Sequence, residues 1–369
     1  MNPDEFINWV NSTFYFYLFI PYVCYFLPKI DFVSSSGSIN QKKYNIRIGT
    51  FVSTLILLFI KCFSITGRDI QSGYRNQFFS SNSLFGTADD TLEIGFRFLN
   101  FVIYHLGGQN FYLFLFICGF LTLFPVIYFV FKYGNNLNIS LTLFLYATLF
   151  YFQGFSLLRL YLASSIALFS IDNLLHEKTK KSLLWFLIAF SIHRSVIILL
   201  FVIIIYALKS IKLSRVIVFS FIILLFSILA KGFIISHFTG RYAIYQQQSA
   251  NELGFAILLK YLPLFILVQY ARKKQSIDRL AFSLLWLGFE FGILSYFIPI
   301  IGRQQAVFLP IIFLVGYFVK QINFNSNLSK IGLEILFLIY GTIQLYLYIK
   351  GYYQLDGIMP YVSYLGFNI

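Results

Sequence analysis

Charged residues are scarce in this sequence: only 11% of its 369 residues are Asp, Glu, Lys or Arg, and four are His. A soluble domain typically carries about 25% charged residues. This deficit, together with 59% hydrophobic and 21% aromatic residues, excludes a soluble globular protein, a nucleic-acid binder and a disordered chain. We therefore predict an all-α polytopic membrane protein. Spans of about 20 residues leave no room for a soluble domain, so residues 1–369 should form one membrane domain.

Cysteine and the common catalytic motifs are also scarce. The three cysteines, Cys24, Cys62 and Cys118, lie in apolar runs without metal-ligand spacing, so we expect packed or lipid-facing thiols. No zinc spacing, phosphate-binding glycine loop or Gly-x-Ser-x-Gly turn occurs, and we expect neither a metal nor a cofactor. Residues 1–12 contain no Lys or Arg, which is atypical of a cleavable signal peptide and indicates that the first apolar run is a retained span.

The sequence does contain a series of apolar runs bounded by charged residues. These runs predict about 11–12 membrane segments. They are residues 13–28, 47–65, 111–131, 137–152, 157–175, 183–208, 216–235, 255–271, 280–299, 304–319 and 331–349. The run 183–208 is interrupted by His193-Arg194-Ser195 and has basic residues at both flanks. We therefore expect a re-entrant hairpin there, with its tip at His193 and Arg194.

Four clusters of basic residues assign the two sides of the membrane. Cytoplasmic loops collect Lys and Arg, so all four clusters are placed on the cytoplasmic side. The clusters lie within residues 42–47, 178–181, 209–215 and 272–279. This assignment puts both termini on the outer side, together with the segments 66–110 and 237–252. We expect these two segments to form the active face.

Within the first outer segment, residues 91–106 predict a short helix that lies on the membrane surface. A capping-box pattern at residues 87–90 precedes it, two glycines follow it, and Glu93 and Arg97 have the i,i+4 spacing of an ion pair. A short, capped helix with an ion pair is typical of an interfacial helix.

Arginine is unexpectedly frequent on the predicted outer side, which positive-inside sorting should deplete. The outer arginines are Arg68, Arg75, Arg97, Arg159, Arg194, Arg241 and Arg303. A guanidinium matches a phosphate bidentately, and charges at membrane depth are usually functional. We therefore predict an outer site for a lipid-linked diphosphate, bound by Arg68, Arg159, Arg194, Arg241 and Arg303. The alternative is that these arginines form ion pairs with Asp69, Glu93, Glu252 or Glu290, or snorkel to the interface.

His193, Asp69 and Glu93 are the candidate catalytic bases, because each can accept a proton from a reacting hydroxyl. The alternatives are a hydrogen-bonded packing role for the histidine, and helix capping or neutralisation of arginines for the carboxylates. Outer aromatic residues are candidates for stacking on sugar rings, with a membrane-interface belt as the alternative. The sugar-binding candidates are Tyr74, Tyr242 and Tyr245.

Several short motifs follow one another between residue 67 and the C-terminus. They are Gly67-Arg68-Asp69 with Tyr74 and Phe78, Glu93-Ile-Gly95-Phe96, Ser156-Leu-Leu-Arg159, Ala189-Phe-Ser-Ile-His193-Arg-Ser195, Arg303 at the start of a span, and Pro360-Tyr361. In their order and spacing, these motifs resemble the blocks of the EpsG-type Wzy polysaccharide polymerases.

This resemblance implies a GT-C-like membrane glycosyltransferase. Such an enzyme joins polyprenyl-diphosphate-linked oligosaccharide repeat units, as both donor and acceptor, on the outer side of the bacterial inner membrane. The further partners it implies are the lipid bilayer, a chain-length regulator and a flippase. Two alternatives stay open: a glycan ligase, and a flippase or transporter supported by the intramembrane residues Lys260 and Glu290. The charges are biased to one face and no internal repeat is present, which favours the one-sided enzyme.

Overall fold

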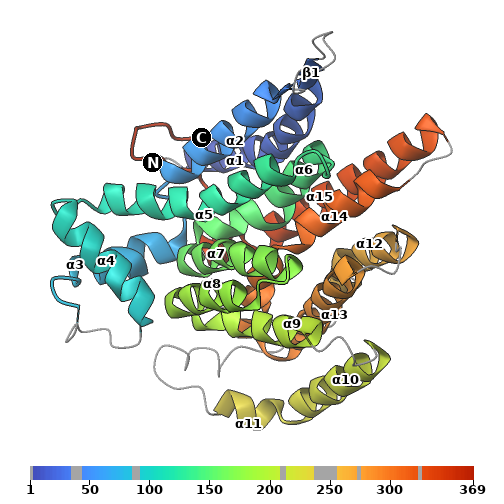
Figure 1. Cartoon of the computed structure of the whole chain (residues 1–369). Coiled ribbons are helices and arrows are strands. Elements are labelled where there is room, and N and C mark those ends of the chain that lie inside the picture. The colour runs from blue at the N-terminus through green and yellow to red at the C-terminus, as the bar shows by residue number, and fades with distance from the viewer. Residues whose placement is uncertain are drawn as a thin grey trace.

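The computed structural model describes residues 3–34, 44–84, 92–207, 213–236, 256–271, 276–322 and 326–369, which are almost entirely helical (Figure 1). The helices are α1 (Pro3–Phe26), α2 (Ile48–Cys62), α3 (Arg75–Phe79), α4 (Ile94–Leu106), α5 (Phe111–Tyr133), α6 (Ile139–Tyr146), α7 (Leu158–Leu175), α8 (Thr179–Ile192), α9 (Ile198–Ala207), α10 (Leu213–Leu229), α11 (Lys231–Ser236), α12 (Ala256–Ala271), α13 (Ser276–Phe297), α14 (Ile311–Gln321) and α15 (Asn327–Asp356). Two short strands, β1 (Phe32–Ser34) and β2 (Tyr44–Ile46), pair antiparallel.

The predicted class, an all-α polytopic membrane protein, is confirmed. Five helices in the described part of the chain are long and apolar enough to cross a membrane, and a bent pair, Ile301–Phe308 with Ile311–Gln321, adds a sixth. The five are Val10–Ile30, Phe111–Tyr133, Leu158–Leu175, Ile277–Phe297 and Asn327–Gly351. Shorter apolar helices, such as α2 and α4, accompany them. The number of about 11–12 membrane segments stays a prediction.

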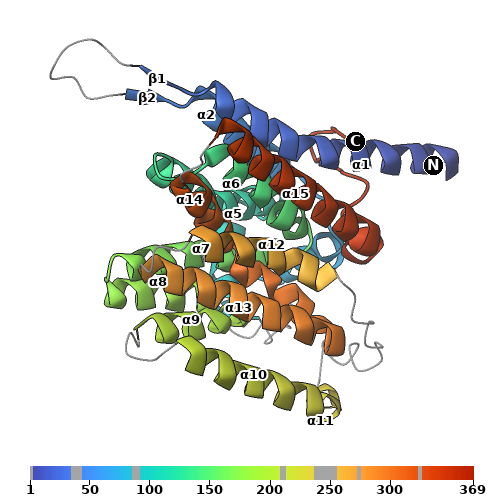
Figure 2. The ribbon, with the colours of Figure 1, turned by 90° about the vertical axis from the view of Figure 1, so that its right-hand side faces the viewer.

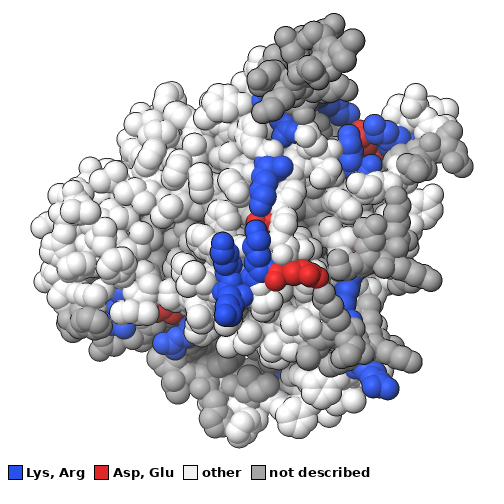
Figure 3. All heavy atoms as spheres, in the orientation of Figure 1, with Lys and Arg blue, Asp and Glu red and all other residues white. Residues whose placement is uncertain are grey.

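The molecule has two distinct ends. Figure 2 shows α1, α13 and α15 running in nearly the same direction, with the β1–β2 hairpin at one end and both chain termini at the other. These are named the hairpin end and the termini end. Seen from the hairpin end (Figure 3), most of the surface is uncharged, and Lys and Arg side chains gather near its middle and at its edges.

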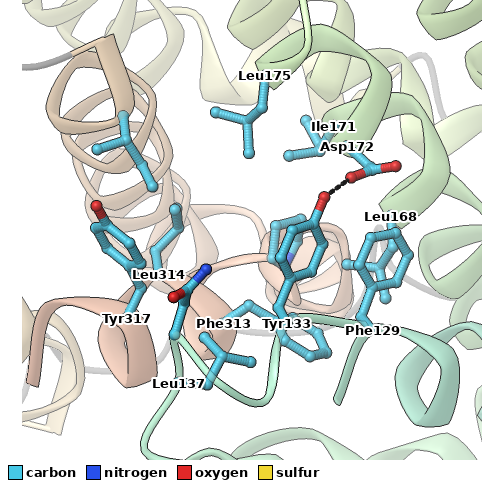
Figure 4. A pocket seen from close by; sticks show the side chains of 13 residues that line it. Phe129, Tyr133, Leu137, Leu168, Ile171, Asp172, Leu175, Phe313, Leu314 and Tyr317 are labelled. Atoms are coloured by element: carbon cyan, nitrogen blue, oxygen red, sulfur yellow. Dashed lines mark hydrogen bonds between the residues drawn. The ribbon is translucent and has the colours of Figure 1, made fainter. Parts of the chain in front are cut away.

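Polar contacts at the hairpin end join helices that are distant in the sequence. Lys132 Nζ lies 2.8 Å from Asp172 Oδ2, and the Tyr133 hydroxyl also donates to Asp172. Lys29 pairs with Glu334 at 3.1 Å. A mostly apolar cavity of about 170 Å³ lies between α5, α7 and α14, with the Tyr133–Asp172 hydrogen bond at its wall (Figure 4). Asp172 is thirteen residues after Arg159 on α7, so this wall of the cavity lies about 20 Å along the helix from Arg159.

Buried tyrosines tie the C-terminal segment to the first helices at the termini end. The hydroxyl of Tyr17 donates to the Ile358 carbonyl at 2.7 Å, and that of Tyr361 donates to the Ile60 carbonyl at 2.9 Å. Each hydroxyl finds an acceptor, as burial of a tyrosine requires. The cysteines, expected to be packed or lipid-facing, are buried free thiols.

Two local expectations need correction. The predicted interfacial helix begins at Ile94 rather than at residue 91, with Glu93 at its N-cap position and without a side-chain cap. The capping-box residues 87–90 lie outside the described residues. The run 183–208 is broken at His193 as predicted, but its first helix begins at Thr179 and has 14 residues, more than the apolar run alone suggested. Whether this pair of helices re-enters the membrane stays a prediction.

Candidate active site

A buried ion pair joins three distant segments at the termini end. Arg159, in the first turn of α7, donates from Nη1 to Glu93 Oε2 at 2.8 Å, and the backbone N–H of Arg194 donates to Glu93 Oε1 at 3.2 Å. Only 9% of the Arg159 side chain and 6% of the Glu93 side chain are exposed. Buried charges persist when they are paired. The pair therefore fixes the start of α4, the start of α7 and the break between α8 and α9 relative to one another.

The Glu93 carboxylate was expected to pair with Arg97, one turn along the same helix, and this expectation was wrong. Burial raises the pKa of Glu93, but the Arg159 charge acts together with further lowering effects, and their sum holds the pKa below its ordinary value of 4.5. The hydrogen bond from the Arg194 N–H and the His193 imidazole, when it is protonated, are among these further effects. Both carboxylate oxygens are hydrogen-bonded, which favours a positioning role for Glu93 over that of a proton acceptor.

Gly95 allows α4 to approach α8 closely. A Cβ atom on Gly95 would lie 2.3 Å from Ser191 Oγ and 2.8 Å from the Ser191 carbonyl oxygen. We expect Gly95→Ala to push α4 away from α8, displace Glu93 and cost about 1–3 kcal/mol of stability, as overpacking does. The midpoint of thermal unfolding in detergent measures this effect. Gly73→Ala is the matched control, because a Cβ there would have no neighbour within 4 Å. Equal midpoints for the two variants would contradict the close approach.

Tyr74 supports the ion pair and does not present a face to solvent. It lies at the end of a short π-helical turn, Ile70–Tyr74, and only 8% of its surface is exposed. Its hydroxyl accepts from the Arg159 backbone N–H at 3.3 Å, and its ring packs edge-to-face on Phe96. The Arg159 guanidinium lies 5.5 Å from the centroid of the same Phe96 ring. The expectation that Tyr74 is a surface residue available for sugar stacking is thus corrected by its burial.

A second, more open ion pair lies at the same end. Arg303 Nη1 is 3.9 Å from Asp69 Oδ2, and the exposed fractions of the two side chains are 41% and 36%. Arg303 belongs to a 3₁₀ segment, Pro299–Phe308, which packs on α7 and contacts the 3₁₀ turn that begins at Arg194. Arg68, next to Asp69, is exposed. The fold therefore brings Arg68, Arg194 and Arg303 to the end of the molecule that holds Arg159.

His193 lies at the break between α8 and α9 in extended backbone conformation. Its Nδ1 accepts a hydrogen bond from the Ser195 backbone N–H at 3.1 Å. A neutral imidazole that accepts at Nδ1 carries its proton on Nε2. His193 is therefore arranged to donate from Nε2, which suits contact with an anionic oxygen better than removal of a proton.

The structure adds a carboxylate that the motifs did not single out. Asp356 ends α15, is 7% exposed and accepts a hydrogen bond from the Tyr348 hydroxyl at 2.8 Å. The charges of Arg303 and Asp69 both act on it. The one local signal in the sequence was a carboxylate directly before Gly357, near the end of a long apolar run.

Part of the predicted site lies outside the described residues. This applies to Arg241, Tyr242, Tyr245 and the outer segment 237–252, and also to the two aspartates at positions 89 and 90.

Comparison with known proteins gives one match. The family model described as the EpsG family matches residues 47–363, which is most of the chain and includes every residue of the two ion pairs and Asp356. Comparison with curated proteins found no match, and neither did comparison with solved structures. Because the family model covers most of its length, the chain belongs to the EpsG family.

Proposed function

We propose that the protein joins polyprenyl-diphosphate-linked oligosaccharide repeat units by glycosyl transfer on the outer side of the bacterial inner membrane. At the level of the family, membership supports a Wzy-like polysaccharide polymerase. The observation that carries the finer proposal is the cluster at the termini end, where Arg159 and Glu93 form a buried pair beside Arg194 and Arg303. A GT-C-like architecture, with 66–110 and 237–252 as the active face, is part of the proposal.

The lipid-linked diphosphate would bind to the exposed arginines. The side chains of Arg68 and Arg194 are exposed and that of Arg303 is 41% exposed, so each can reach a ligand at the membrane surface. Arg159 Nε is buried and has no hydrogen-bond partner among the described residues, which leaves one donor for a ligand oxygen. Arg241 belongs to the same proposed set. Guanidinium–phosphate bonds are charge-assisted and often bidentate, which suits them to hold a diphosphate.

The proposed reaction is a displacement at the anomeric carbon of the donor. The acceptor hydroxyl oxygen forms a bond to that carbon, the bond from the carbon to the diphosphate oxygen breaks, and the hydroxyl proton passes to a carboxylate. The arginines stabilise the negative charge that develops on the leaving diphosphate, which is usually the largest single contribution to catalysis. Among the three bases expected from the sequence, Asp69 has the most accessible carboxylate, because Glu93 is committed to Arg159 and His193 is oriented as a donor.

The proposed orientation of the enzyme follows from the distribution of charge. The basic clusters predicted to be cytoplasmic flank helix ends opposite to Arg159, such as the start of α8. The termini end, which holds the exposed arginines, would then face outward, where donor and acceptor are presented in the outer leaflet. A flippase that delivers these lipids and a chain-length regulator are the expected partners.

A reconstituted reaction tests the proposal. We expect purified protein in detergent, given one polyprenyl-diphosphate-linked repeat unit and no other protein, to form a ladder of products spaced by one repeat unit. Gel electrophoresis and mass spectrometry resolve the ladder, and the ladder should persist in EDTA because the proposed stabilisation uses arginine rather than a metal. Substrate binding without a ladder would contradict the proposal. Transfer to a different acceptor would then identify a ligase, and movement between liposome leaflets would identify a flippase.

A further inference from the structure

Asp356 is held against the segment that carries Asp69. The backbone N–H of Gly67 donates to the carbonyl oxygen of Gly357 at 3.1 Å. Gly357 has φ +60°, and a Cβ there would lie 2.9 Å from the backbone nitrogen of Arg68. Both the conformation and the close approach require glycine at this position. The end of α15 is therefore fixed on residues 67–68, although the two segments are almost 290 residues apart in the chain.

The position of this carboxylate is unfavourable for a purely structural role. Asp356 is buried, and it lies at the C-terminal end of a 30-residue helix, where the helix dipole disfavours negative charge. Burial raises the pKa of Asp356, and the negative charge of Asp69 adds to this effect. The Tyr348 hydrogen bond and the positive charge of Arg303 act in the opposite direction without cancelling it. A perturbed carboxylate beside an ion pair is typical of a functional site.

Asp356 is a buried carboxylate with one of its oxygens held by the protein. Oδ2 accepts from the Tyr348 hydroxyl at 2.8 Å, which fixes the orientation of the carboxylate. Because Tyr348 donates to Oδ2, Oδ1 is the oxygen of this carboxylate that we consider as the proton acceptor. Asp69, the alternative base, is paired with Arg303 at 3.9 Å, so its carboxylate already has a positively charged partner.

We propose that Asp356 is the proton acceptor for the acceptor sugar hydroxyl, with Asp69 and Arg303 positioning the reacting groups; this inference rests on the proposed glycosyl transfer. The hydroxyl proton passes to Oδ1 of Asp356 as the oxygen attacks the anomeric carbon, and the diphosphate leaves with the electron pair of the broken carbon–oxygen bond. Asp356 then releases the proton to water. The step needs no other reactant, and each charge that develops has an opposite charge nearby.

The test compares wild-type protein with Asp356→Asn in the reconstituted reaction. Asparagine keeps the shape and can still accept the Tyr348 hydrogen bond, but it cannot accept a proton. We expect binding of the polyprenyl-diphosphate-linked repeat unit to be retained, while the rate of ladder formation falls about 10²–10⁴-fold, as removal of a general base does. Asp172→Asn is the matched control, since Asp172 is also a buried aspartate bonded to a tyrosine but lies at the hairpin end. It should polymerise near the wild-type rate.

A second variant keeps the inference open to refutation if Asp356→Asn does not fold. Tyr348→Phe removes a hydrogen bond that lowers the pKa of Asp356, so the acidic limb of the rate–pH profile should move to higher pH. An unchanged limb, or a ladder from Asp356→Asn near the wild-type rate, would overturn the role of Asp356 while the polymerase function stands. Wild-type protein that binds the lipid-linked unit but forms no ladder would overturn both.

Discussion

Arg159→Lys is expected to abolish most polymer formation while the protein remains folded and inserted in the membrane. Lysine keeps the positive charge opposite Glu93, so the buried pair survives. It loses the planar fork, the contact with Phe96 and the Nε donor that has no protein partner among the described residues. Loss of one donor that stabilises transition-state charge costs about 10²–10³ in kcat. The rate of ladder formation in the reconstituted reaction measures the loss.

Arg47→Lys is the matched control for this variant. Arg47 lies at the hairpin end and donates from two guanidinium nitrogens, to the Phe131 carbonyl at 2.8 Å and to Asn135 Oδ1 at 2.6 Å. We expect this variant to lose packing contacts but to keep its rate. If Arg159→Lys made polymer of near-normal length and at a near-normal rate, Arg159 would not act on the diphosphate, and the exposed arginines alone would have to bind it.

The helices could be predicted from the sequence because their signals are local. A span needs a continuous apolar run, and the charged residues at its ends stay near the membrane surfaces. The runs 111–131 and 157–175 therefore lie within two residues of α5 and α7. The break at His193 was predictable for the same reason, since three polar residues interrupt an apolar run.

The partners of the site residues could not be predicted from local spacing. The sequence suggested that Glu93 pairs with Arg97 four residues later, whereas the fold brings Glu93 to Arg159 and to the backbone of Arg194. A buried carboxylate interacts more strongly with an opposite charge that is also shielded from water than with one exposed to water. Such a charge can come from any segment of the chain. Sequence reasoning named ion pairing with Glu93 and Asp69 as an alternative fate of the outer arginines, and the structure contains both pairs.

Exposure was the least predictable property of the site. Tyr74 belongs to a loop rich in aromatic residues, a composition that suits either a membrane interface or a protein core. Its burial follows from the packing of Phe96 and the start of α7 around it. Asp356 could not be recognised from the sequence, because residues 67–69 and 303, which contact its segment or act on its charge, come near it only after the chain has folded.

Glu93→Ala is expected to produce the largest loss of stability in this region. It leaves the Arg159 charge buried without its carboxylate, and removal of one partner of a buried pair costs about 3–5 kcal/mol. Asp69→Ala is the comparison at the same end, because the Asp69–Arg303 pair is partly exposed and such pairs contribute about 1 kcal/mol or less. Thermal unfolding in detergent, followed by the fluorescence of the three tryptophans, gives both midpoints.

The double variant Glu93→Ala with Arg159→Met separates the charge from the packing. Replacement of a buried ion pair by apolar side chains is often neutral, so the double variant should recover much of the unfolding midpoint without recovering polymer formation. The deficit of Glu93→Ala should also depend on pH. The pKa of Glu93 is lowered in the folded protein, so its stabilisation is present above 4.5 and is lost as the pH falls through the folded-state pKa. A deficit that is equal at neutral pH and well below 4.5 would mean that Glu93 contributes packing rather than charge to this site.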